Sequence, residues 1–239
     1  MRERLPLPIS LTLIAIAVLI GSLAIGSGIR NRNANNVITV TGSAKQMITS
    51  DYAIWDFSVT SQAASAAVAS TALVGWTSKI EDFLKQHGIQ AGELTIYPIS
   101  TNTVTPSTGN SNKVVGYQLT RNYEVRSARV DAIQSVAQAS SSLLTAGIPF
   151  SAQPLQYVYT KLDSVRGPLL AAAVRDAEQR AKTLLAATGT KLGKLRGVDV
   201  SPFQITPPNS TQVSDYGEYD TSTIQKDVTA VVNVSFALS

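Results

Sequence analysis

The sequence predicts an α+β fold, with antiparallel sheet covered by three helices and preceded by one N-terminal transmembrane helix. Three observations lead to this prediction. An uncharged apolar run lies close to the N-terminus, several later segments alternate apolar and polar residues, and three longer segments repeat apolar residues at helical spacing. Alternation favours antiparallel sheet with one covered face, because the strands of a buried parallel sheet are almost continuously apolar.

The apolar run occupies residues 9–25, and no charged residue occurs between Leu5 and Ile29. As a helix this run approaches the thickness of the bilayer's hydrocarbon core. We therefore expect residues 1–32 to form a membrane anchor and linker, and residues 33–239 to form an exported domain. A cleaved signal peptide is the alternative, since small residues follow the run. Both interpretations place the domain on the periplasmic or extracellular side of the cell membrane.

Strand candidates are identified by strict alternation of apolar and polar residues. In residues 53–60 the apolar side chains share one face, and residues 115–126 alternate most clearly, with Arg121 the one interruption of the apolar face. Pro98 confines a shorter candidate to the edge or end of a sheet. Strands are predicted at residues 37–41, 53–60, 94–99, 115–126, 150–162 and 228–238.

Helix candidates repeat apolar residues every three or four positions. Gly88 supplies a stop for the first of them and Gly189 for the third, while the second ends near Gly147. Pro168 suits the first turn of the third helix. Helices are predicted at residues 63–86, 130–147 and 168–189, with polar loops at residues 100–113 and 201–220.

The composition excludes several kinds of chemistry. The chain has no cysteine, so it holds no disulfide, thiol nucleophile or thiolate zinc site. Its one histidine, His87, lies beside a helix-ending glycine, where it suits capping better than catalysis. Phosphate-binding loops, nucleophile elbows and dinucleotide fingerprints do not occur in the sequence. We therefore predict a protein that is not an enzyme, with no catalytic residue, cofactor or metal.

The net charge of +4 does not indicate nucleic-acid binding. Four of the basic residues are arginines flanking the apolar run, and residues 33–239 carry 16 basic and 15 acidic side chains. A domain so nearly neutral lacks the basic footprint that phosphate binding needs.

Three aromatic residues in the C-terminal loops are the candidate contact residues. Phe203 follows a proline, and Tyr216 and Tyr219 lie in the acidic aromatic stretch at residues 215–220. Exposed tyrosines offer amphipathic area of the kind enriched at interfaces. We predict that these three side chains contact another subunit or a client.

Several short segments match a known family in order and spacing. They are ITVTGSA at residues 38–44, VTSQ at residues 59–62, FLKQHGI at residues 83–89, GYQL at residues 116–119, AAAVRDAEQRA at residues 171–181 and GTKLG at residues 189–193. Together they resemble the SIMPL-domain family, which includes the bacterial periplasmic immunogenic protein and the oxidative-stress defence protein. The resemblance implies a single exported α+β domain, self-association into ring-like or channel-like homo-oligomers, and a loosely defined role in envelope stress. It implies no catalytic residue.

The combined prediction is a membrane-anchored, non-enzymatic cell-envelope protein. We expect it to self-assemble into a homo-oligomeric ring, channel-like or cage-like structure with a role in envelope or oxidative stress. The alternative is an exported binding module, whose loops at residues 100–113 and 201–220 hold a small molecule, a glycan or a protein client.

Overall fold

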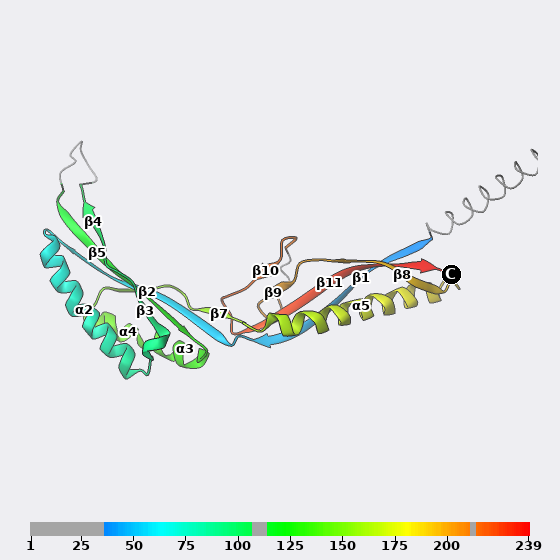
Figure 1. The fold of residues 1–239 in the computed structure, drawn as a ribbon, viewed down its shortest axis with the longest axis horizontal. Helices are drawn as coiled ribbons and strands as arrows, with labels where there is room; N and C mark the ends of the chain where they lie inside the picture. Colours follow the sequence, from blue (N-terminus) through cyan, green and yellow to red (C-terminus); the bar gives the residue numbers. More distant parts are fainter. Residues whose placement is uncertain (1–35, 107–113, 211–213) are drawn as a thin grey trace, which may run out of the picture. The chain divides into compact units, whose positions relative to one another are not determined.

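The computed structural model describes residues 36–106, 114–210 and 214–239 (Figure 1). The chain divides into two compact units. Within the described part, unit 1 contains residues 36–44, 167–202 and 230–239, and unit 2 contains residues 45–166 and 203–229. The described elements are β1 (Val37–Thr49), β2 (Tyr52–Ala63), α2 (Ala66–Gln86), η1 (Ala91–Glu93), β3 (Leu94–Ile96), β4 (Ser100–Val104), β5 (Gly116–Ser127), α3 (Val130–Ala139), α4 (Ser141–Thr145), β6 (Phe150–Ala152), β7 (Gln156–Val158), α5 (Leu162–Ala186), β8 (Leu192–Val200), β9 (Gln204–Thr206), β10 (Glu218–Tyr219) and β11 (Gln225–Leu238).

Unit 2 is built on an antiparallel sheet in the order β3-β5-β2-β6, with β4 also paired to β5 and β7 to β2. The long β2–β5 ladder forms its centre, and α2, α3 and α4 pack on one face (Figure 1). The alternation in β2 has the predicted effect, because Trp55, Phe57 and Val59 are all buried beneath the helices. The strands predicted at residues 53–60 and 115–126 are thus confirmed.

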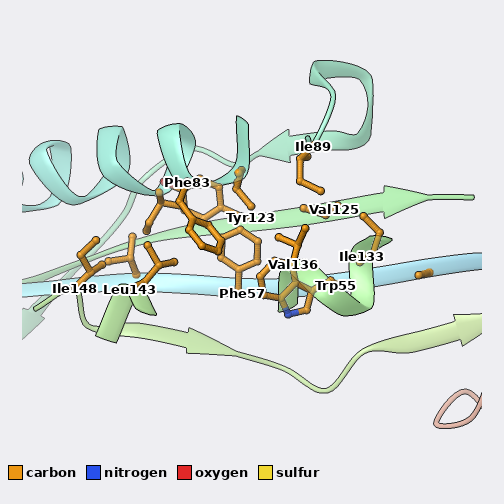
Figure 2. Close-up of a cluster of buried hydrophobic side chains, with 14 of the residues drawn as sticks. Trp55, Phe57, Phe83, Ile89, Tyr123, Val125, Ile133, Val136, Leu143 and Ile148 are labelled. Carbon is orange, nitrogen blue, oxygen red and sulfur yellow. The ribbon is translucent and has the colours of Figure 1, made fainter. Parts of the chain in front are cut away.

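An aromatic cluster forms the middle of the unit 2 core (Figure 2). The rings of Phe57 and Tyr123 stack with centroids 4.9 Å apart, and Trp55 lies 4.5 Å from Phe57. The stacked pair lies directly opposite in the β2–β5 register, so the same alternation that buries each ring also brings the two together.

Unit 1 contains the N-terminal part of β1, most of α5, β8 and the C-terminal part of β11. β11 pairs with β1 on one side and with β8 on the other. Along α5, Ala173, Ala177 and Ala181 are fully buried, one every four residues. These small side chains let the helix lie against β1 at Gly42, where an added Cβ would lie 2.7 Å from the Ala177 Cβ.

Several predicted elements differ from the observed ones. The helix expected at residues 130–147 is divided into α3 and α4. At the division, Ser140, Ser141 and Ser142 each donate a hydroxyl hydrogen bond to the carbonyl three residues earlier, which competes with regular helical bonding. The strand expected at residues 150–162 is two short strands, β6 and β7, with Pro154 between them.

Other differences concern the sheets and the third helix. β4 lies where a polar loop was expected, and β8 occupies a segment to which no strand was assigned. β9 and β10 pair in parallel, so the sheet containing β11 is not wholly antiparallel. α5 begins at Leu162, which places Pro168 inside the helix instead of in its first turn.

The transmembrane part of the predicted fold class requires correction. No helix among residues 36–106, 114–210 and 214–239 is long and apolar enough to cross a membrane. The run at residues 9–25 that was expected to do so lies outside the described residues. The described architecture is α+β with two sheets.

Candidate assembly surface

Tyr216 is the most exposed of the three predicted contact residues. The residue is 97% exposed and lies in a turn that the Gly217 N–H closes by donating to the Ser214 carbonyl. The Tyr216 backbone N–H donates to the Ser214 hydroxyl, so the turn is held while the ring extends into solvent. A large exposed ring on a hydrogen-bonded turn is suited to a contact, and its role as one remains a prediction.

Tyr219 and Phe203 have different surroundings from Tyr216. Tyr219 is in β10, and its hydroxyl oxygen lies 3.4 Å from both the backbone nitrogen and the carbonyl oxygen of Tyr159. Phe203 is half-buried, and the guanidinium carbon of Arg166 lies 5.9 Å from the centre of its ring. The three residues therefore have three different sets of neighbours, and the structure does not show them acting as one surface.

A buried ion pair supports the segment that carries these aromatic residues. Lys226 has no exposed side-chain area, and its Nζ lies 3.0 Å from Asp220 Oδ2 and also donates to the Thr223 carbonyl. Burial raises the pKa of Asp220, but hydrogen bonds from Ser222, Thr223 and Lys226 outweigh it and hold that pKa far below the usual range. Burial lowers the pKa of Lys226, and the hydrogen bond and negative charge of Asp220 raise it only in part.

The Asp220 carboxylate of this segment is already hydrogen-bonded by neighbouring side chains. Asp220, one of the three carboxylates in the stretch, is occupied by Lys226 and two hydroxyl side chains. In the described part of the chain, no group of three or more histidine, aspartate or glutamate side chains is placed to hold a metal ion.

The single histidine caps a helix, as its position in the sequence predicts. His87 is the C-cap of α2, and its Nδ1 lies 2.8 Å from the Phe83 carbonyl oxygen. The ring also packs on Phe83, with centroids 4.1 Å apart. These contacts give His87 a structural role.

The sheet of unit 1 exposes an apolar strip that the sequence analysis did not identify. Val232, Val234 and Phe236 of β11 are at most 5% exposed, and they pair with Val200, Val198 and Leu195 of β8. Paired residues share a face of an antiparallel sheet, yet these three β8 residues are 49%, 42% and 53% exposed. We call Leu195, Val198 and Val200 the β8 strip. It continues the core face of the sheet, and no element among the described residues covers it.

α5 covers the other two strands on this same face. On the opposite face of the sheet, the Thr39 and Thr41 hydroxyls hydrogen-bond to Ser235 and Asn233 of β11. Side chains alternate between the two faces along a strand, so Gly42 and Val232 both lie on the face that α5 covers. Gly42 is also the point where β1 touches α5. The helix therefore lies over β1 and β11, and the β8 strip extends beyond it.

The β1 edge of the sheet is partly closed by α5. The Asp176 carboxylate accepts hydrogen bonds from the Ser43 backbone N–H and from Arg180, each at 2.8 Å, and the bond from Ser43 lowers the pKa of Asp176 most. A groove of about 560 Å³ lies beside this contact, lined by residues 39–41 and by α5 residues that include Arg180 and Leu184. The Asp176 carboxylate occupies the Ser43 amide, so a further strand cannot pair with β1 at that residue.

Comparison with known proteins establishes the family. The model of the SIMPL family, described as a protein of unknown function (DUF541), matches residues 38–236, which is most of the chain. The chain belongs to the SIMPL family. This confirms the resemblance found in the sequence. The family description names no enzymatic activity.

The other comparisons add little about this SIMPL protein. A search of curated proteins finds no match. Among solved structures, an amidase of the hydantoinase/carbamoylase family from Burkholderia phymatum is similar at 15% identity and a TM-score of 0.29. The similarity covers 47% of this chain and 30% of the amidase chain. At that level it carries no argument about fold or activity.

Proposed function

We propose that this SIMPL protein is non-enzymatic and works by assembling with copies of itself into a ring, channel-like or cage-like homo-oligomer. The observation that carries the proposal is the β8 strip, whose aliphatic side chains continue a buried core face and are about half exposed. Apolar side chains placed in this way are typical of a surface that is covered on association.

The strip supports association of limited strength by itself. Covering one half-exposed aliphatic side chain contributes about 1 kcal/mol, so two strips together contribute about 6 kcal/mol. Association costs roughly 4–15 kcal/mol in lost freedom of motion. A stable assembly therefore needs further contacts, such as main-chain hydrogen bonds between sheet edges, and Phe203, Tyr216 and Tyr219 are candidates for others.

The proposal includes a location on the periplasmic or extracellular side and a role in envelope or oxidative stress. The location rests on the apolar run at residues 9–25 and on the family resemblance, and the stress role rests on the resemblance alone. Because the chain has no cysteine, we expect any protection to be indirect, through scaffolding, membrane integrity or client binding. Purified protein should accordingly show no peroxide turnover above a buffer control.

The assembly proposal is tested by the native mass of the full chain. Mass photometry and light scattering over a range of concentrations should show multiples of the 25.3 kDa chain, and electron microscopy should show a closed particle. A protein that stays monomeric up to its cellular concentration contradicts the proposal.

The predicted aromatic contacts are tested separately by replacing Tyr216 and Tyr219 with alanine. Loss of assembly in a folded double variant assigns these residues to a subunit contact. Intact assembly removes them from it. Nothing among the described residues favours the alternative of a binding module.

A further inference from the structure

The open edge of β8 presents main-chain groups ready to pair. The Ser201 N–H donates to the Val231 carbonyl at 3.0 Å, so Ser201 faces β11. Main-chain groups in an antiparallel strand face alternate sides. In the regular part of the ladder, the N–H and C=O groups of Val198 and Val200 therefore point away from β11, toward the open edge.

We propose that β8 pairs in antiparallel orientation with β8 of a second copy about a two-fold axis, joining the unit 1 sheets of two chains into one. This inference rests on the proposed function and specifies one of its contacts, because a two-fold contact closes at two copies and a larger ring needs a second, different interface. The β8–β8 interface is self-complementary, since the same strand is used by both copies. The two strips then lie next to each other on the face that carries both α5 helices.

The charges of β8 favour the antiparallel orientation. Lys194 and Arg196 lie in the first half of the strand and Asp199 in the second, and all three are exposed. Antiparallel pairing places the acidic half of each strand against the basic half of the other, whereas in-register parallel pairing aligns like charges. A register centred on Val198 sets Asp199 opposite Gly197 of the second copy, so the two Asp199 residues are diagonal neighbours and are not directly opposed.

The two edges of the sheet differ in a way that favours β8. On β1, the Asp176 carboxylate already accepts the hydrogen bond of the Ser43 N–H. On β8, the apolar strip and the free groups of Val198 and Val200 lie on the same strand. The edge that offers both hydrogen bonds and apolar area is therefore the one that a second copy pairs with.

Cysteine cross-linking of the full chain tests the inference, because the native chain contains no cysteine. In the register centred on Val198, the two residues 198 lie directly opposite each other, within the Cα separation that a disulfide bridges. V198C should form disulfide-linked dimers under mild oxidation. V68C, on the exposed face of α2, and T39C, on the β1 edge, should not.

Charge reversal provides a second measurement that leaves the core untouched. D199R should raise the dissociation constant about tenfold, because it adds a cation next to the basic half of the second strand. R196D should do the same, because it adds an anion next to the acidic half of the second strand. The double variant R196D/D199R restores opposite charges across the two-fold axis and should recover association. An effect of D199R that the double variant does not reverse contradicts the antiparallel arrangement.

The outcomes separate this inference from the proposed function. If the chain assembles but V198C cross-links no faster than V68C, the β8 contact is wrong and the assembly proposal stands. If the chain is monomeric, both are wrong. If the thiol introduced by V198C is protected from a thiol reagent in dilute monomer, another part of the same chain covers the strip, and the β8 contact is again wrong.

Discussion

At the scale of single residues, Gly42 is the position where β1 tolerates no side chain. A Cβ there would overlap the Ala173 carbonyl oxygen and the backbone nitrogen of Ala177. We expect G42A to lower the free energy of unfolding by about 1–3 kcal/mol, since helix or strand must move to admit a methyl group. Urea denaturation measures the change.

The matched control is Gly75, in the middle of α2, where an added Cβ meets no atom within 4 Å. G75A should stabilise the protein by about 0.5–1 kcal/mol, because alanine is the better helix former. Equal stability of the two variants would show that the β1–α5 contact at Gly42 is looser than described.

Glu93 is the residue whose ionisation should most clearly affect stability. The pKa of Glu93 is lowered from 4.5 to about 2, and the hydrogen bonds from Arg129 are the largest cause. Hydrogen bonds from Ser127 and from the Gln90 N–H lower it further, whereas burial raises it. A carboxyl with a lowered folded-state pKa contributes stability that is full above its unfolded value of 4.5 and lost as the pH falls toward 2.

E93Q should therefore flatten the pH dependence of the unfolding free energy between pH 4.5 and pH 2. Denaturation of both proteins across that window measures the difference in slope. Asp163, a carboxylate 95% exposed beside Arg166, provides the control D163N, which should destabilise the protein less than E93Q does at pH 7. Parallel curves for E93Q and the native protein contradict the role given to Glu93.

At the scale of elements, the Asp220–Lys226 pair holds the connection into β11. K226M removes the cation and leaves the Asp220 carboxylate without its buried partner. We expect a loss of about 3 kcal/mol, measured by thermal or urea unfolding. K161M, which breaks the exposed pair with Asp51, should lose less than about 1 kcal/mol. Similar losses in the two variants would mean that burial does not distinguish these pairs.

The elements also show which features could be predicted from the sequence. Strand β2 alternates without a break and β5 alternates except at Arg121, so their pattern predicted both their existence and their buried faces. β8 does not alternate regularly: its register shifts near Leu195, so the apolar residues Leu195 and Val198 are three positions apart. β4 is composed mainly of serine, threonine and asparagine, and its pairing with β5 cannot be seen in its own residues.

The candidate surface was less predictable than the fold for a related reason. Phe203, Tyr216 and Tyr219 were chosen by residue type, and exposure, neighbours and mutual distance are properties of the folded chain. The β8 strip has significance only because its partners on β11 are buried and α5 does not reach it. These are facts about neighbouring elements, and the sequence of β8 contains none of them.

At the scale of the whole molecule, each compact unit combines segments that are far apart in the sequence. β1, α5 and β11 each contribute residues to both units, and unit 1 joins the N-terminal strand to the C-terminal one. Three of the four boundaries fall inside β1, α5 and β11, so the composition of the chain does not mark them as linkers.

Assembly should make the stability of the whole chain depend on its concentration. Association that covers the β8 strip only in folded chains removes folded monomer from the unfolding equilibrium, so Tm should rise as protein concentration increases. D199R should reduce this dependence, and R196D/D199R should restore it. Calorimetry at a series of concentrations measures the effect, with V68C in reducing buffer as a control that keeps the native slope. Light scattering could show oligomers of the native chain while Tm stays independent of concentration. That result would mean that assembly contributes nothing to the stability of the fold. The β8 strip would then be exposed in the assembly as well.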